Sequence, residues 1–178
     1  VHKFYNDRRK SLVKCHPNRA HELLVELEKN YDVYVITQNV DDLHERAGSS
    51  RVLHLHGELM KARSMDDPTR LYTLDEEHLE TSPDTLGPNG DHVRPHIVFF
   101  QEAVPNIERA IEWASMADIF VVIGTSLAVY PAASLLHYVR QDTPVYYIDP
   151  HPAPVPASVN VIPLPATQGM EKLVHILS

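Results

Sequence analysis

Gln38, Asn39 and Asp41 bring two amides and a carboxylate together within four residues of the chain. An amide both donates and accepts hydrogen bonds, so this group could hold a carboxamide such as nicotinamide. A simpler interpretation is that Asn39 or Asp41 caps a short helix, which is a common use of such side chains.

His56 precedes Gly57, and an imidazole that is neutral near pH 7 is the usual general base of enzymes. His54 lies two residues earlier and shares a strand face with His56. The pair could also be two ligands of a metal ion, although no third ligand is evident nearby. In a chain with 12 histidines, such a pair also arises easily by chance.

Gly124 is followed by Thr125 and Ser126 after a strongly apolar stretch. The glycine lets a ligand approach the main chain, and the two hydroxyls can bond ribose or phosphate oxygens. The alternative is a strand end followed by a turn. Asp149 is placed like the acid that binds ribose hydroxyls in dinucleotide folds, and its alternative is a turn formed with Pro150.

Tyr5 and Arg8 stand three residues apart on an expected helix, so they share a face. A phenol beside a guanidinium forms a receptor for a carboxylate. The alternative is a solvated helix on which Arg8, Arg9 and Lys10 are surface charges.

These residues need strands and helices that bring them together. We expect strands over residues 31–37, 51–55, 96–100, 118–123 and 145–148, and helices over 2–14, 20–27, 41–48, 106–116, 130–140 and 169–177. Short apolar strands that alternate with amphipathic helices predict an α/β fold, a Rossmann-like doubly wound parallel sheet with helices on both faces. Ligands of such folds bind beyond the carboxyl ends of the strands.

The polar segment between the second and third expected strands has low periodicity and several prolines and glycines. We therefore expect one Rossmann-like domain made of residues 1–63 and 94–178, with a small loop-rich insertion over 64–93.

The composition excludes several kinds of site. The 178 residues include 16 Lys and Arg against 24 Asp and Glu, a formal net charge of −8, which argues against binding nucleic acid by charge alone. No two of the six glycines lie closer than Gly87 and Gly90, so a G-x-G-x-x-G fingerprint or P-loop is impossible. The single cysteine, Cys15, excludes an intramolecular disulfide and a C-x-x-C zinc module.

No apolar run approaches the roughly 20 residues of a membrane-spanning helix, so we expect no membrane partner. The start of the chain has no signal-peptide pattern, and its one cysteine is unpaired. We therefore expect a cytoplasmic protein.

Five segments in order carry a more specific pattern. They are TQNVD (37–41), LHERAG (43–48), LHGEL (55–59), RPHIV (94–98), and GTS (124–126) with VYPAA (129–133). Their order and spacing closely resemble the sirtuin family of NAD-dependent protein-lysine deacylases. The resemblance covers nearly the whole chain and implies NAD as cofactor and acyl-lysine proteins or peptides as partners, with the oligomeric state left open.

The resemblance implies two catalytic residues, His56 as the general base and Asn39. It also implies that Gln38, Asn39, Val40 and Asp41 line the pocket for nicotinamide and its ribose. The other NAD-binding residues would be Gly124, Thr125 and Ser126 at phosphate and ribose, Asp149 at the adenosine ribose, and Ala166 with a main-chain contact to adenine.

For the acyl-lysine substrate, the resemblance implies that Val98 and Phe100 form a tunnel wall. Gln101 and Glu102 would pair with the peptide as an added strand. The family's Phe-Gly-Glu reads Phe-Gln-Glu here, so a side chain replaces hydrogen at a peptide contact.

Residues 4–9 resemble the sirtuin class that includes the mitochondrial desuccinylase and the bacterial enzymes. In that class, a Tyr-x-x-Arg pair binds the carboxylate of succinyl- or malonyl-lysine. Tyr5 and Arg8 match the pair, so we expect desuccinylase or demalonylase activity beside deacetylase activity.

Two further departures from the family matter. Its opening strand and Gly-Ala-Gly-x-Ser loop should precede Val1, so this N-terminal unit is expected to be missing. The family usually binds zinc with four cysteines, but Ser64 stands where the first would fall, and we expect a zinc-free module. Alternative functions are an ADP-ribosyltransferase on the same fold and a non-catalytic module that binds NAD or ADP-ribose.

Overall fold

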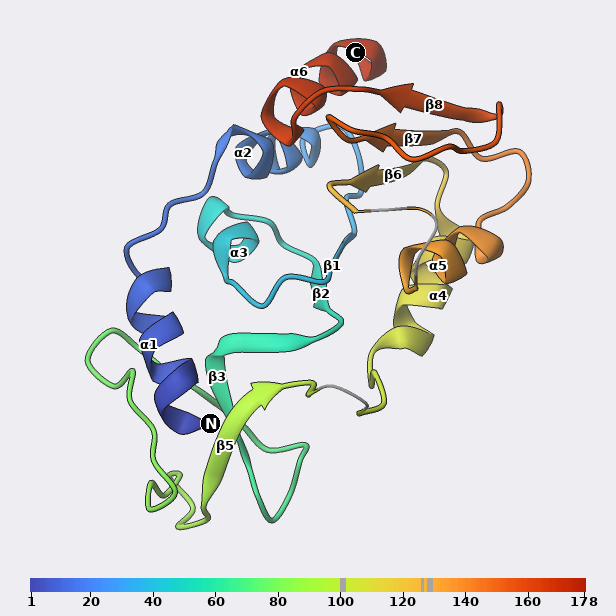
Figure 1. Ribbon diagram of the computed structural model, residues 1–178. Coiled ribbons are helices and arrows are strands. Elements are labelled where there is room, and N and C mark those ends of the chain that lie inside the picture. The colour runs from blue at the N-terminus through green and yellow to red at the C-terminus, as the bar shows by residue number, and fades with distance from the viewer. Residues whose placement is uncertain (100–101, 126, 128–129) are drawn as a thin grey trace.

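The computed structural model describes residues 1–99, 102–125, 127 and 130–178. Its N-terminus lies beside a small antiparallel sheet, and its C-terminus lies at the opposite end of the molecule (Figure 1). Between them are the strands whose ends carry most of the candidate residues.

The parallel strands form two hydrogen-bonded groups in the described part of the chain. β1 (Val35–Thr37) pairs with β2 (Val52–His54), while β7 (Val145–Ile148) pairs with β6 (Phe120–Ile123) on one side and β8 (Val159–Ile162) on the other. β8 falls in a Pro-rich stretch for which the sequence predicts no strand. Its partner strand, β7, lies more than ten residues earlier in the chain, so the local residue pattern does not reveal the pairing.

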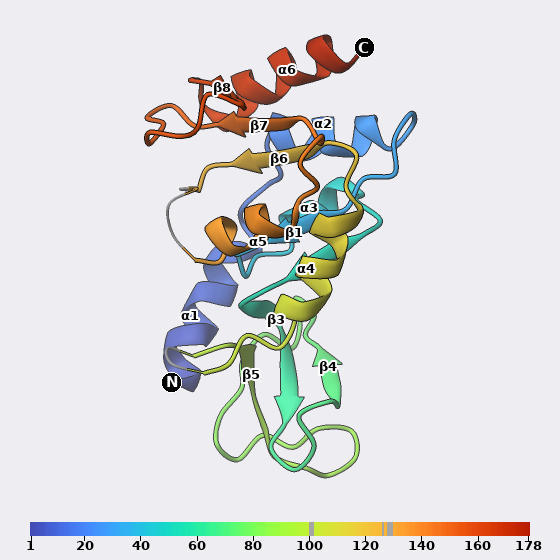
Figure 2. The same cartoon turned by 90° about the vertical axis from the view of Figure 1, so that its right-hand side faces the viewer.

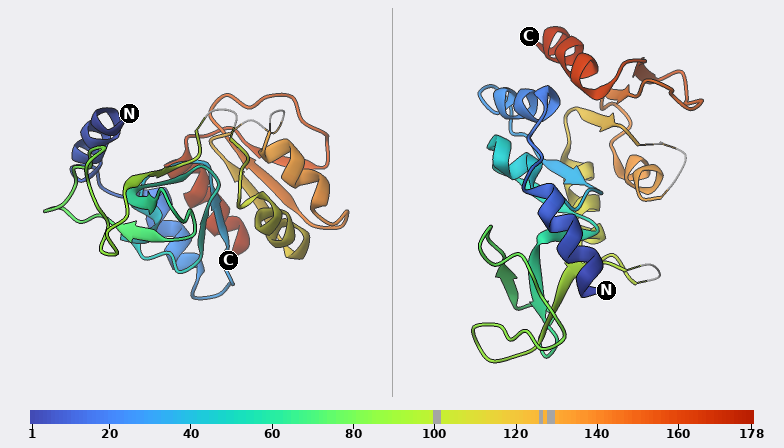
Figure 3. Two further views of the ribbon diagram at one scale, coloured as in Figure 1. Left: turned by 90° about the horizontal axis from the view of Figure 1, so that it is seen from below. Right: turned by 60° about the vertical axis from the view of Figure 1, so that its left-hand side comes forward.

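Helices cover both faces of the parallel sheet formed by β6, β7 and β8, which confirms the expected α/β fold (Figures 2 and 3). On one face, α2 (Arg19–Leu27) and α6 (Ala166–Leu177) enclose a buried apolar cluster that includes Ile148 and Met170. On the other face, α4 (Ile107–Met116) and α5 (Ala132–Tyr138) pack through Ala110, Ala114 and Leu135.

Local chemistry explains where several helices begin and end. The Asn18 side chain accepts a hydrogen bond from the main-chain N–H of His21, whose ring accepts one in return, and this capping box starts α2. α3 (Leu43–Ala47) ends at Gly48 with φ +111°, a left-handed conformation that favours glycine. In α6, a Cβ at Gly169 would lie 2.3 Å from Ile148 Cγ2, so this glycine lets the helix pack closely on β7.

The small sheet is antiparallel, in the order β4 (Leu71–Thr73), β3 (Gly57–Ser64) and β5 (Val93–Ile97). The prediction of a strand over 96–100 within the parallel sheet is therefore wrong, because the strand spans Val93–Ile97 and pairs antiparallel with β3. The cause is the turn at Gly57, where φ is +98° and a Cβ would lie 2.1 Å from the His96 carbonyl oxygen. The chain turns here, and β3 pairs with β4 and β5 instead of joining the parallel strands.

The predicted insertion over 64–93 lies between the flanking strands β3 and β5, which supply most of the small sheet. We call this part, residues 57–97, the small module. The predicted domain boundaries thus fall inside its strands, and the division into two domains stays a prediction.

α1 (His2–Leu12) lies against the small module (Figure 1). Its Arg9 side chain is fully buried, and donates from Nε to the Leu59 carbonyl (2.8 Å) and from Nη1 to the Leu79 carbonyl (3.1 Å). Burial lowers the pKa of this guanidinium. Arg9 therefore fixes the helix that carries Tyr5 and Arg8.

In the described residues, no helix is long and apolar enough to cross a membrane.

Candidate active site

The ends of β1 and β6 meet through side chains. Gln38 Nε2 donates to Thr125 Oγ1 at 3.2 Å, which joins the loop after β1 to the loop after β6. The Asn39 N–H donates to Thr37 Oγ1 at 3.0 Å, and the Asn39 side chain belongs to an exposed residue. The side chains of Gln38, Asn39 and Thr125, two amides and a hydroxyl, thus lie together at the carboxyl ends of the strands.

Val40 and Asp41 continue this loop in different ways. The Val40 carbonyl accepts a hydrogen bond from the Leu59 N–H at 2.7 Å, which ties the loop to β3. Asp41 Oδ1 accepts from the Leu43 N–H at 3.1 Å at the start of α3. Asp41 thus bonds the first residue of α3 from the position before its N-cap, Asp42, and a role of Asp41 toward NAD remains a proposal.

His56 is half-buried between β2 and β3. Its carbonyl accepts a hydrogen bond from the Val98 N–H at 2.9 Å. The predicted general base and the predicted wall of the acyl tunnel are therefore held side by side by the main chain.

His54 does not form a group with His56. Its Nε2 lies 2.8 Å from Glu45 Oε2 and 3.7 Å from Glu58 Oε1, and its Nδ1 lies 3.2 Å from the Asn39 carbonyl. The donor atoms of Glu45, His54 and Glu58 all lie within 4.8 Å of one another, a spacing that a metal ion could bridge. Glu45 and Glu58 stand in two of the motifs quoted for the family resemblance, but sequence reasoning gave them no role, because local spacing does not show that they meet His54.

The electrostatics of this group favour a protonated histidine. Burial alone would lower the pKa of His54, but the hydrogen bond and negative charge of Glu45 raise it above its usual value. Burial opposes ionisation of Glu45 as well, yet its bond to His54 lowers the pKa of that carboxyl. Each partner thus favours the charged form of the other.

The residues predicted for the nucleotide lie at the ends of β6, β7 and β8. Gly124 has φ +67° and no heavy atom within 4 Å of a built Cβ, so its surroundings are open. Asp149 Oδ1 accepts from the His151 N–H at 2.8 Å, which is the turn formed at Asp-Pro. Ala166 is the first residue of α6 and is half-buried. Ser126 lies outside the described residues.

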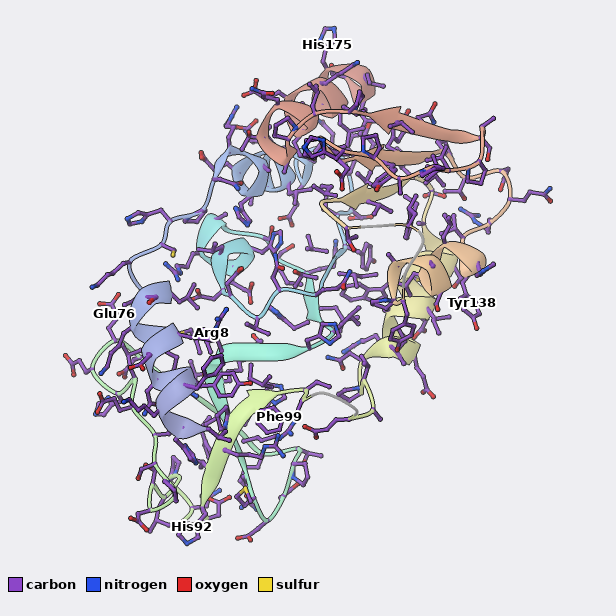
Figure 4. The ribbon with its side chains drawn as sticks, viewed as in Figure 1. Arg8, Glu76, His92, Phe99, Tyr138 and His175 are labelled. Atoms are coloured by element: carbon purple, nitrogen blue, oxygen red, sulfur yellow. The ribbon has the colours of Figure 1, made fainter. Side chains whose placement is uncertain are left out.

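Tyr5 and Arg8 lie on α1, as predicted. The Tyr5 ring stacks on Phe99 with ring centroids 6.0 Å apart, and the Arg8 guanidinium lies 5.5 Å from the Phe4 ring centroid. Arg8 is exposed, and it projects from α1 on the side that faces Phe99 (Figure 4). Phe99 directly follows Val98, so the stack places the phenol near the segment bonded to His56.

Glu102 is held by its own chain. It accepts hydrogen bonds from the Phe99 N–H at 2.8 Å and from Arg94 Nη2 at 3.2 Å, and it lies 3.5 Å from Arg63 Nη2. The bond from the Phe99 N–H is the main cause of the lowered pKa of this carboxyl. Its predicted pairing with a peptide stays a prediction, and Phe100 and Gln101 lie outside the described residues.

The four-cysteine zinc site that the family resemblance implies does not fit this chain. Ser64 is 1% exposed, and its hydroxyl accepts from the N–H groups of Asp66 and Asp67 at 3.1 Å each. It also bonds to Asp91, whose carboxylate accepts from Tyr72 at 2.8 Å and Arg70 at 3.1 Å. These bonds, that of Ser64 first, lower the pKa of Asp91 to about 2.

Comparison with known proteins identifies the family of this chain. A sequence model described as the Sir2 family matches residues 1–131. An NAD-dependent protein deacylase of Bacteroides thetaiotaomicron is 52% identical over 179 residues, which cover 98% of this chain and 76% of that protein. An NAD-dependent protein deacylase of Helicobacter pylori is 48% identical over 172 residues, which cover 96% of this chain and 74% of that protein.

Solved structures agree. A Sir2 homologue in complex with NAD superposes with a TM-score of 0.81 at 34% identity, over 98% of this chain and 70% of that one. A Sir2 protein bound to an acetylated peptide gives a TM-score of 0.77 at 31% identity, over 93% and 73% of the two chains. With a family match over most of its length and relatives of this identity, the chain belongs to the Sir2 family.

Proposed function

We propose that this protein is an NAD-dependent protein-lysine deacylase that transfers an acyl group from lysine to ADP-ribose and releases nicotinamide. The observation that carries the proposal is that four strand-end segments are joined in pairs, by the Gln38–Thr125 bond and by the Val98–His56 bond. Relatives named NAD-dependent protein deacylases, and Sir2 structures with acetylated and propionylated peptides, support it.

Each segment has a distinct task in this reaction. Gln38, Asn39 and Asp41 hold nicotinamide and its ribose, and the acyl oxygen attacks the anomeric carbon as nicotinamide leaves. His56 then takes a proton from the nicotinamide ribose, in the role of general base that imidazoles most often have in enzymes. Thr125 keeps the loop after β1 in place through Gln38.

The test is release of nicotinamide from NAD that depends on the presence of an acetyl-lysine peptide. We expect His56→Tyr to lower kcat about 100-fold or more, in line with the loss of a general base. The same substitution at the exposed His175, which projects from α6 far from the strand ends (Figure 4), is the matched control and should leave kcat unchanged. Equal activity of the His56→Tyr variant would contradict the proposal.

The product separates the alternatives. O-acyl-ADP-ribose supports deacylation, whereas ADP-ribosylated protein identifies an ADP-ribosyltransferase. Binding of NAD without release of nicotinamide identifies a non-catalytic binding module.

We also propose that the acyl group can carry a carboxylate, as in succinyl- or malonyl-lysine. Tyr5 stacks on Phe99 at the acyl side of the site. Among the described residues, no carboxylate lies within ion-pair distance of Arg8, so its guanidinium is available to a substrate. A charged hydrogen bond to Arg8 would favour the acidic acyl group.

Arg8→Met should lower kcat/KM for a succinyl-lysine peptide about 10-fold or more and change that for an acetyl-lysine peptide little, since a charge-assisted hydrogen bond contributes about 1.5–3 kcal/mol. Lys3→Met removes the same charge from an exposed position of the same helix and serves as control. An unchanged ratio of the two rates would rule out this role of Arg8.

The cellular setting remains part of the proposal. Cys15 is unpaired and exposed, as is common in the reducing cytoplasm. Acyl-lysine proteins of that compartment are the partners we propose.

A further inference from the structure

The protonation of His54 follows from its neighbours. A carbonyl oxygen only accepts, so the contact between Nδ1 and the Asn39 carbonyl requires a proton on Nδ1. The other nitrogen, Nε2, faces the carboxylate of Glu45 at 2.8 Å. A lone pair there would oppose a negative charge, so Nε2 needs a second proton or a bound cation.

The charged groups around His54 come from each element packed against it. Glu45 lies on α3 and Glu58 on β3, and Lys61 reaches Glu58 at 3.0 Å. His44 and His96 also face it, and burial lowers the pKa of both rings, which favours their neutral forms. Two carboxylates and one ammonium leave one negative charge, which an imidazolium at His54 balances.

His54 in turn holds the main chain of Asn39. The parallel ladder between β1 and β2 reaches the Thr37 carbonyl, which accepts from the Leu55 N–H at 3.0 Å. The next main-chain hydrogen bond to a neighbouring strand is at Val40, whose carbonyl accepts from the Leu59 N–H of β3 at 2.7 Å. Between these two main-chain hydrogen bonds, the Nδ1–H of His54 donates to the Asn39 carbonyl.

A second contact fixes His54 itself. Its side chain is 5% exposed, and its own carbonyl accepts from Asn106 Nδ2 at 2.8 Å. Burial and the contacts of both ring nitrogens thus hold the ring between Glu45 of α3 and the Asn39 carbonyl, whereas Asn39 itself is exposed.

We infer that His54, held as an imidazolium by Glu45, is a positioning residue that orients Asn39 for deacylation. This role rests on the proposed function. When His54 loses a proton, the remaining one goes to Nε2, which faces Glu45. Nδ1 then presents a lone pair to the Asn39 carbonyl, and the loop loses its support.

Two pairs of variants test the inference. His54→Asn keeps a donor at the position of Nδ1, while His54→Gln keeps one near Nε2 and loses the bond to Asn39. We expect His54→Gln to lower kcat about 10- to 100-fold, since small misplacements of a reacting group have effects of this size. His54→Asn should recover a large part of that loss, with KM for the peptide changed little in both.

Glu45→Gln removes the charge that keeps His54 protonated, from a residue whose side chain is 38% exposed. The alkaline limb of the kcat profile should move to lower pH, because the pKa of His54 falls without Glu45. Glu112→Gln, an exposed position of α4, is the matched control and should leave the limb in place. A limb that stays in place in Glu45→Gln would overturn the inference, as would equal kcat values for the two His54 variants.

Nitrogen NMR of the His54 ring gives a result that does not depend on activity. The ring should keep protons on both nitrogens to a higher pH in the wild-type protein than in Glu45→Gln, and a ring that titrates at the same pH in both proteins would overturn the inference. A chelator should leave kcat unchanged. Loss of activity that added Zn²⁺ restores would show a cation at Nε2 and likewise overturn it. A wild-type protein that releases no nicotinamide would instead refute the proposed function.

Discussion

The parallel strands and the small module differ in the polarity of their buried side chains. Around β7, the buried side chains are apolar, and Ile148 and Met170 are both 0% exposed. In the small module, the buried residues include Ser64 and Asp91, and the fully buried Arg9 enters from α1. The comparison teaches that this module adds charge-assisted hydrogen bonds to an apolar core that includes Leu59 and Val93, in the region where the family resemblance implies zinc.

Among the changes to buried polar groups that test this comparison, Arg9→Met should lower the stability of the protein most. The carbonyls of Leu59 and Leu79 would lose their donor inside the protein. We expect the free energy of unfolding to fall by about 3 kcal/mol, since buried unsatisfied acceptors cost about 1–3 kcal/mol each. Urea denaturation measures this. Arg8→Met at the exposed neighbouring position should change stability by less than about 0.5 kcal/mol, and equal stability of the two variants would undo the comparison.

A smaller effect should come with pH. The pKa of Asp91 in the folded protein, about 2, lies below its value of about 3.9 in an unfolded chain. The folded protein thus favours the ionised form, so this stabilisation is present above about pH 4 and is lost as pH falls toward 2. In Asp91→Asn, the acid loss of stability between these pH values should be smaller than in the wild type.

Met170→Ala serves as the counterpart in the parallel-strand region. It should destabilise by about 2–5 kcal/mol but keep the wild-type dependence on acid, because it removes no titrating group. The contrast would fail if Asp91→Asn and Met170→Ala lost stability in parallel as the pH was lowered.

The smallest effect should come from metal removal. Because the chain has one cysteine and Ser64 bonds Asp91 in the small module, dialysis against EDTA should leave the thermal unfolding midpoint unchanged. Stoichiometric zinc by elemental analysis, lost together with stability on dialysis, would show that a metal stabilises this module after all.

The sequence predicted those features that leave a local pattern. The strand over 145–148 is an apolar run, and the structure places it at the same residues. The Asn18 cap and the helix end at Gly48 follow from side-chain and backbone chemistry within a few residues. The side-by-side position of Gln38 and Thr125 follows from the rule that strand ends share an edge.

The remaining features depend on contacts between distant parts of the chain. The turn at Gly57 depends on the close approach of β5, whose residues lie some forty positions away. The burial of Arg9 depends on carbonyls at Leu59 and Leu79. Glu45 of α3 meets His54 of β2 only in the folded chain, where their side chains lie 2.8 Å apart. None of these changes the local pattern of residue types.

The two neighbouring arginines of α1 point in directions about 100° apart, as consecutive helical residues do. Arg9 faces the protein and is fully buried, while Arg8 faces outward beside Phe4. In protein engineering, the outward face can therefore be exchanged to alter acyl preference while the inward face keeps the helix in place. In evolution, the loop that supplies the Leu79 carbonyl can be shortened only together with a replacement of Arg9, whereas position 8 is free to diverge with the substrate.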